Sequence, residues 1–214
     1  MSLFYSVQAP ETITENTRAI FYIHGYGSNE QDLLALTQDL PKDILHVSFR
    51  GRFPVEMSGG YAWYDINFNH PEEYFHKEQA VESLNALLNA FVEIQKKYGI
   101  KDGNISLCGF SQGGILAYAL AFKNPHLFSK IACMSAYPEE KLLNDIPKDR
   151  KKLNQLRFFI SHGTDDAIIP IEWGKKGADL LYDLSCYFTF REYMFGHGIN
   201  QKNYIDLVEF LSNA

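Results

Sequence analysis

The sequence is poor in cysteine and in basic charge, and each shortage excludes a class of protein. Three cysteines in 214 residues, an odd number with no Cys-x-x-Cys pair, do not make the framework of a disulfide-rich secreted domain. Cys108, Cys133 and Cys186 each lie in an apolar run, so we expect buried, reduced thiols. A net charge of −6 argues against a nucleic-acid binder, which needs a basic surface to neutralise phosphates.

Long apolar runs are also missing. No stretch approaches the roughly 18 apolar residues that predict a membrane-spanning helix. The N-terminal segment MSLFYSVQAPETI has no basic start and no long apolar centre, so it does not resemble a signal peptide. These features predict a cytoplasmic protein. We find no repeat and no linker, and we expect one domain over residues 1–214.

Apolar runs alternate with segments of helical period along the chain. Strands are expected at 18–25, 43–51, 104–109, 130–135, 157–162 and 186–191. Helices are expected at 28–40, 72–99, 112–123, 171–184 and 199–212. Ser28 and Gln31 fit a capping box for the first helix, and Gly99 suits the C-terminal cap of the second. The alternation predicts an α/β fold with a mostly parallel sheet and helices on both faces.

Two segments lie outside this alternation. Residues 51–66 are rich in glycine and aromatic residues and are expected to form a loop. The charged stretch 139–156 is either a solvated surface segment or a small cap over a site.

Four expected strands are followed by glycine beside a side chain that can do chemistry. The segment HGYGS follows the first strand, GFSQGG the third, HGTDD the fifth and FGHGI the sixth. Ligands of open α/β sheets bind outside the carboxyl ends of the strands. We therefore expect these four segments to meet at one site.

The segment Gly109-Phe110-Ser111-Gln112-Gly113 matches the G-x-S-x-G nucleophile elbow. In an elbow, a strand turns sharply into a helix and presents the serine hydroxyl in a strained backbone conformation. Glycines leave room for the close turn because they have no Cβ atom. The alternative for Ser111 is a capping serine at an ordinary helix start. The apolar strand before it and the apolar helix after it favour the elbow.

A serine nucleophile needs a base, and the base needs an acid that orients it. In this fold type the order along the chain is Ser, then Asp or Glu, then His. His197, between two glycines, is the candidate base. Asp165 and Asp166 are adjacent, and their spacing alone does not separate them as the acid. His162 ends a strand, and we expect it to order the acid loop rather than to act as the base.

An oxyanion hole needs two backbone N–H donors. Gln112, directly after the nucleophile, is expected to supply one, and Tyr26 in HGYGS the other. The other histidines (His46, His70, His76 and His126) lie away from the strand ends, and no metal-ligand spacing such as HExxH occurs. We therefore expect no metal.

With these residues in place, the sequence resembles the phospholipase/carboxylesterase family of the α/β-hydrolase superfamily, which includes acyl-protein thioesterases and small carboxylesterases. The motifs IHGYGSN, GFSQGG, HGTDDAIIP and GHG occur in the family's order, and GGYAWYDI is similar to a further family stretch. The resemblance implies an α/β-hydrolase fold with a minimal cap. It also selects Asp166, four positions before Pro170, as the acid beside Ser111 and His197.

The resemblance implies a serine hydrolase that acts on small-molecule esters or thioesters without a cofactor, and it makes a homodimer an expectation. Trp63, near the expected site, either packs its loop onto the sheet or walls a pocket. Ile168 and Ile169, beside the acid, are expected to line the same groove. The alternatives are a lysophospholipase or acyl-protein thioesterase, a peptidase, and a catalytically silent member of the fold used for binding. A silent member usually lacks one of the three triad residues, and this sequence has all three.

Overall fold

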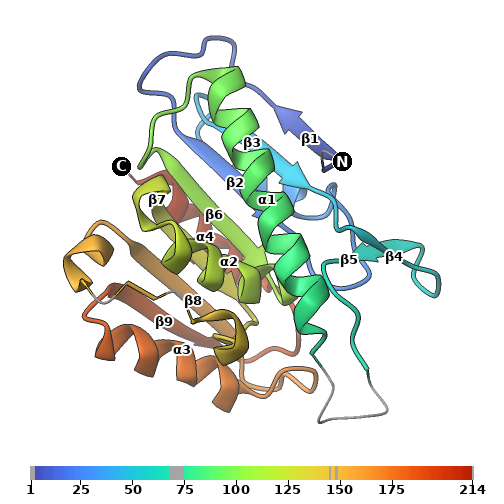
Figure 1. Cartoon of the computed structure of the whole chain (residues 1–214). Coiled ribbons are helices and arrows are strands. Elements are labelled where there is room, and N and C mark those ends of the chain that lie inside the picture. The colour runs from blue at the N-terminus through green and yellow to red at the C-terminus, as the bar shows by residue number, and fades with distance from the viewer. Residues whose placement is uncertain (1–2, 68–74, 145, 148, 214) are drawn as a thin grey trace.

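A seven-stranded sheet forms the centre of the protein in a computed structural model that describes residues 3–67, 75–144, 146–147 and 149–213. Its strand order is β1-β3-β2-β6-β7-β8-β9 (Figure 1). Every neighbouring pair is parallel except β1–β3, which is antiparallel. The strands are β1 (Tyr5–Gln8), β2 (Ala19–Ile23), β3 (Leu45–Phe49), β6 (Ile105–Phe110), β7 (Phe128–Met134), β8 (Arg157–Gly163) and β9 (Tyr187–Tyr193).

Helices cover both faces of this sheet. Figure 1 shows α1 (Lys77–Tyr98), α2 (Gln112–Lys123) and α3 (Ile171–Asp183) in front of the strands and α4 (Gln201–Ser212) behind them. The long helix α1 ends at Gly99, whose positive φ of 67° gives a left-handed cap, as the sequence predicts. The first residues of the expected helix 72–99 lie outside the described residues, as does His70. The predicted α/β fold is confirmed.

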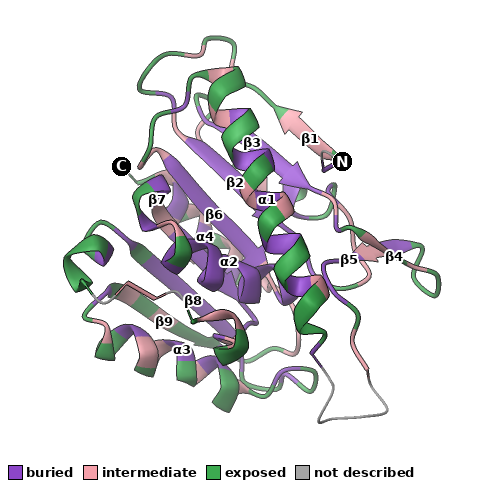
Figure 2. Cartoon of the chain, in the orientation of Figure 1, coloured by how far each residue is buried: buried purple, intermediate pink, exposed green. Residues whose placement is uncertain are grey.

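The apolar core lies between the sheet and the helices. All five residues of β2 and all five of β3 are buried, because central strands of a sheet covered on both faces have no solvent face. Figure 2 shows these strands in the buried colour behind α1, which has exposed residues on its outer face, whereas α2 is buried along nearly its whole length. The three cysteines are buried and free. Burial raises the pKa of the Cys108 thiol to about 12 and that of Cys186 to about 11, so both are protonated near neutral pH.

The expected helix over 28–40 is wrong. Only a short 3₁₀ helix, η1 (Leu33–Thr37), forms there. The Ser28 hydroxyl donates to the Asp32 carboxylate (2.7 Å) and does not cap a helix. The backbone of Ser28 also pairs with Tyr61 in an isolated antiparallel bridge, which holds this segment extended. Ser28 therefore makes tertiary contacts in place of the predicted cap.

Two other segments carry more structure than the sequence predicts. The expected loop 51–66 contains a hairpin of β4 (Phe53–Val55) and β5 (Gly60–Ala62). The stretch 139–156 contains two short 3₁₀ helices, η4 (Glu140–Leu142) and η5 (Arg150–Leu153). Leu153 is buried and Leu142 is partly buried against the core, so this stretch is packed onto the body of the protein rather than fully solvated. A further 3₁₀ helix, η3 (Pro125–Leu127), precedes β7.

Candidate active site

Ser111 lies at the sharp turn between β6 and α2. Its backbone angles, φ 54° and ψ −119°, place it in a region that residues with a side chain rarely adopt. A Cβ atom on Gly113 would overlap the carbonyl oxygen of Ile23, and one on Gly109 would overlap that of Gly113. Both glycines of the motif are therefore required by close backbone approach. The strand–turn–helix geometry expected of the elbow is present.

His197 connects Ser111 to Asp166 through its two ring nitrogens. Its Nε2 lies 3.0 Å from the Ser111 hydroxyl oxygen, and its Nδ1 lies 2.7 Å from Asp166 Oδ2. A carboxylate only accepts hydrogen bonds, so Nδ1 carries the proton and Nε2 presents its lone pair to the serine. The Asp166 side chain has no exposed surface, whereas that of His197 is 18% exposed. The structure thus brings His197 together with Asp166, which lies 31 positions earlier in the chain, and with Ser111, which lies 86 positions earlier.

The two adjacent aspartates differ in environment. Asp165 is exposed, whereas Asp166 is buried. Asp166 Oδ1 accepts the backbone N–H groups of Ile168 (2.9 Å) and Ile169 (2.8 Å), which leaves Oδ2 for His197. His162 is also fully buried, and its Nε2 lies 2.8 Å from the Ile169 carbonyl oxygen and 3.3 Å from Asp166 Oδ2. Its position fits the expected role in ordering the acid loop.

The two segments expected to supply oxyanion donors both reach the serine. Gly25, Tyr26, Ser111 and Gln112 line one cavity. Gln112 is the first residue of α2, so its N–H has no carbonyl partner one turn earlier within the helix. The positive end of the helix dipole also lies at this point, where it favours negative charge.

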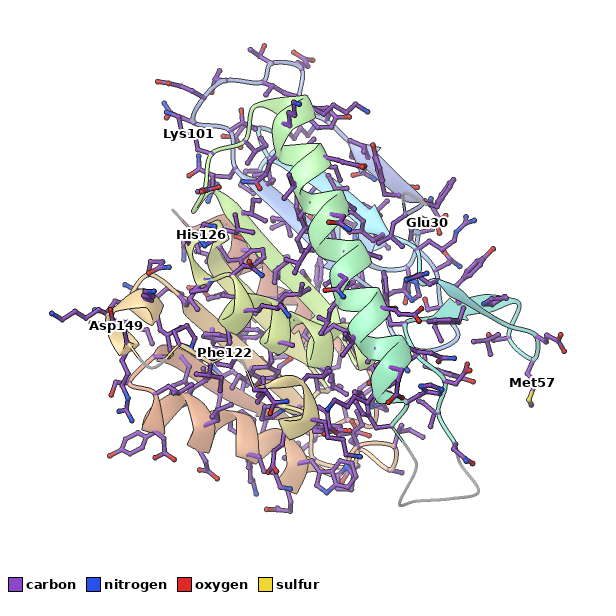
Figure 3. All side chains as sticks on the ribbon, viewed as in Figure 1. Glu30, Met57, Lys101, Phe122, His126 and Asp149 are labelled. Atoms are coloured by element: carbon purple, nitrogen blue, oxygen red, sulfur yellow. The ribbon has the colours of Figure 1, made fainter. Side chains whose placement is uncertain are left out.

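Hydrogen bonds and an ion pair hold the segment that contains Tyr26 in place. Gly27 N–H donates to the Tyr61 carbonyl (2.9 Å), and Tyr61 N–H donates to the Ser28 carbonyl (2.7 Å). Glu30, 4% exposed, pairs through both carboxylate oxygens with Arg50, at 2.6 and 2.7 Å. In Figure 3 Glu30 lies near the end of β3, beside the β4–β5 hairpin, and Met57 marks the outer tip of that hairpin. No pattern in the sequence predicts this ion pair.

The serine opens into a largely apolar cavity of about 360 Å³. Ser111, Phe110 and His197 lie on one side of it. Two polar residues, Ser28 and Asp32, also line it. Its apolar walls come from segments far apart in the sequence, namely Tyr64, Ile66, Phe75, Ile115, Tyr137, Ile168 and Ile169. Ile168 is 58% exposed at the mouth, and Ile169 is 5% exposed. The cavity is of a size and character that suit an apolar group of a small ligand.

Trp63 does not line this cavity, and of the two alternatives that the sequence leaves open for it, burial favours packing of its loop onto the sheet. Its side chain is fully buried in the core beneath the loop, and its indole N–H donates to the His24 carbonyl (2.9 Å). The next residue, Tyr64, reaches the cavity instead. Sequence reasoning missed the walls at Phe75, Ile115 and Tyr137, because an apolar side chain facing a cavity gives the same pattern as one facing the core.

A second, wider groove of about 730 Å³ lies at residues 8–12 and 37–46 and shares no residue with the cavity at Ser111. His46 lines it, and burial lowers the pKa of that histidine to about 4. Within the described ranges, no group of three or more His, Cys, Asp or Glu residues could hold a metal ion. Over the same part of the chain, every helix is too short or too polar to cross a membrane.

A sequence model of the family described as Phospholipase/Carboxylesterase matches residues 5–214. The chain belongs to this family. A curated relative, acyl-protein thioesterase 1 of Kluyveromyces lactis, is 30% identical over 211 residues, which cover 91% of each chain. Carboxylesterase SOBER1 of Arabidopsis thaliana is 26% identical over 149 residues, 66% of this chain and 62% of the relative.

Solved structures of low sequence identity share the fold. Esterase PE8 superposes with a TM-score of 0.84 at 21% identity and covers 99% of this chain and 98% of its own. The Bacillus cereus carboxylesterase gives 0.80 at 20% identity, with 97% and 92% covered. The α/β-hydrolase fold is thereby confirmed, and family membership makes this protein a hydrolase of the carboxylesterase type.

Proposed function

We propose that this phospholipase/carboxylesterase family member cleaves carboxylic esters or thioesters through an acyl-enzyme, with Ser111 as nucleophile, His197 as base and Asp166 as the orienting acid. The observation that carries the proposal is the continuous hydrogen-bonded path from the Ser111 hydroxyl through His197 to the buried Asp166 carboxylate. Alignment of this kind activates a hydroxyl that is otherwise a poor nucleophile at neutral pH.

The chemistry follows from this geometry. His197 Nε2 takes the hydroxyl proton as Ser111 Oγ bonds to the acyl carbon, and the carbonyl oxygen becomes an oxyanion held by the N–H groups of Tyr26 and Gln112. Collapse of this intermediate breaks the bond to the alcohol or thiol, which leaves with the proton from His197. Water then attacks the acyl-Ser111 ester with the same base, and the carboxylic acid is released. Asp166 keeps the imidazole in the reactive tautomer and stabilises its cationic form.

The cavity favours an acyl group as the part of the substrate that is recognised. Its walls are mostly aliphatic and aromatic, and it begins directly at Ser111. The names of the relatives extend the candidates to acyl-protein thioesters and lysophospholipids. A cytoplasmic location, a homodimer and a single domain over 1–214 stay predictions of the sequence.

The test is turnover of p-nitrophenyl esters from acetate to palmitate, with a matched thioester series, by the wild type and by Ser111→Ala. We expect turnover by the wild type and none above background by the variant. Labelling by a fluorophosphonate probe that Ser111→Ala abolishes would identify the nucleophile directly. A wild type that turns over no ester or thioester and takes no label would favour the silent, ligand-binding alternative.

A further inference from the structure

The buried Trp63 makes polar contacts with three separate segments of the chain. Its indole N–H donates to the His24 carbonyl (2.9 Å), and its backbone N–H donates to the side-chain oxygen of Gln112 (3.0 Å). Its carbonyl accepts from the Ser83 hydroxyl on α1 (2.5 Å). Two of these three partners belong to the segments that carry the proposed oxyanion donors.

The contact with His24 fixes the segment that leads into Tyr26. His24 Nε2 accepts the Gly51 N–H (2.9 Å), so the proton is on Nδ1, which donates to the Gly25 carbonyl (2.7 Å). Burial lowers the pKa of His24, which keeps the ring neutral and able to accept that bond. The Trp63 indole binds the backbone carbonyl oxygen of His24. Tyr26, whose N–H is a proposed donor, follows two residues later.

The contact with Gln112 fixes the other donor. The Gln112 side chain is 1% exposed, and both ends of its amide are used. Its oxygen accepts the Trp63 N–H, and its nitrogen donates to the Tyr64 carbonyl (2.8 Å). A side chain held at both ends restrains its own backbone at the start of α2, where the second proposed donor lies.

We propose that Trp63 is a positioning residue that sets the separation of the two oxyanion donors, by joining the Tyr26 segment to Gln112. The inference rests on the proposed function, because an oxyanion forms only if Ser111 attacks an acyl carbon. Backbone donors stabilise the oxyanion when the protein already holds them at hydrogen-bond distance from its position, and a small displacement of a donor loses much of that stabilisation. Trp63 does not line the cavity at Ser111, so it acts through the neighbours that it binds.

The sequence contains only two tryptophans, which allows a single-atom test. Trp173→Phe provides a background in which Trp63 is the only tryptophan. In a tryptophan auxotroph this background can be made with β-(3-benzothienyl)alanine, which keeps the shape of the indole and replaces its N–H with sulfur. Trp173→Phe with ordinary tryptophan is the matched control. Active sites are counted by fluorophosphonate titration, so that kcat refers only to folded, reactive enzyme.

We expect kcat per titrated site to fall about 10- to 100-fold, which does not exceed the fall in kcat that removal of one oxyanion donor causes. KM is expected to change less than about twofold. Affinity for a boronic acid that forms a tetrahedral adduct with Ser111 is expected to fall in parallel, because it mimics the transition state. A merely structural role would lower the number of titratable sites and leave kcat per site unchanged. A kcat per site within about threefold of the control overturns the inference.

Ser83→Ala gives a second test that leaves the indole in place. If the protein with the sulfur analogue does not fold, this variant alone tests the proposed role of Trp63. It removes the anchor of the Trp63 carbonyl, and we expect kcat per site to fall about fivefold with KM little changed. An unchanged kcat here, with no folded sulfur analogue, also overturns the inference. The control enzyme separates the two proposals. If it turns over no ester, the proposed function has failed; if it is active and the variants match it, only the role of Trp63 has failed.

Discussion

Glu30 provides a stability prediction that can be worked out from the structure. Its carboxylate pairs with Nε and Nη2 of Arg50. The Arg50 guanidinium also lies over the rings of Phe4 and Tyr61, at 4.0 and 4.8 Å from their centroids. Hydrogen bonding to Arg50 lowers the pKa of Glu30 from its ordinary 4.5 to about 2. Replacing Glu30 with glutamine keeps the size of the side chain and removes its charge.

The difference between those two pKa values sets the magnitude. At 1.36 kcal/mol for each pKa unit, the ionised Glu30 stabilises the fold by about 3 kcal/mol at pH 7. Because the folded pKa lies below the unfolded one, this stabilisation is complete above pH 4.5 and is lost as the pH falls toward 2. About 1.4 kcal/mol remains at pH 3. The cost of Glu30→Gln is therefore expected to shrink by roughly half between pH 7 and pH 3.

Urea unfolding of the wild type and Glu30→Gln at both pH values measures this cost. Glu15→Gln is the matched control, because Glu15 makes an exposed ion pair with Lys101 (2.9 Å) and exposed pairs contribute little. We expect no resolvable change for the control. A cost for Glu30→Gln that is under about 1 kcal/mol at pH 7, or the same at both pH values, would refute the reasoning.

Two further predictions concern the site itself. Asp166→Asn is expected to lower kcat by several orders of magnitude, about 10⁴-fold in comparable triads, because it disturbs the tautomer of His197. The matched variant Asp165→Asn changes an exposed residue and is expected to keep most activity. Steady-state kinetics measure both, and a larger loss for Asp165→Asn would contradict the assignment of Asp166 as the acid. Gly113→Ala is expected to give little folded protein, because the added Cβ would overlap the Ile23 carbonyl. Gly196→Ala is the control: the atom nearest to its added Cβ is 3.8 Å away, so this variant is expected to unfold near the wild-type temperature. Thermal unfolding measures both, and a stable Gly113→Ala would show that the elbow can relax.

The parts of the site that depend on strand order were predictable from the sequence. Parallel strands bring their carboxyl ends to one edge, so the segments after β2, β6, β8 and β9 had to approach each other. Ser111 and His197 could be found in this way, and the family pattern selected Asp166 from two neighbours. The structure separates those two by burial, which neighbouring positions in a sequence do not reveal.

What the sequence could not predict depends on contacts between distant segments. The four residues of β1 form a strand because they pair with β3, and so short a stretch has little signal of its own. Residues 28–40 carry a helix pattern, yet only the short 3₁₀ helix η1 forms there, and Ser28 pairs with Tyr61 and donates to Asp32 instead of capping a helix. Trp63 was placed near the site correctly, yet nothing in its neighbourhood indicated that its indole would bind a carbonyl in the core.

The backbone of Ser111 has a consequence for how this protein can change over generations. A residue with a side chain held at a φ of 54° and a ψ of −119° costs about 1–3 kcal/mol, which the surrounding packing has to offset. Glycine would adopt the same angles at far lower cost. Selection for stability alone would therefore favour glycine at position 111 and discard the hydroxyl. The serine at position 111 therefore costs stability, and it presents the hydroxyl that the proposed chemistry requires, so a trade-off between stability and activity is built into this one residue.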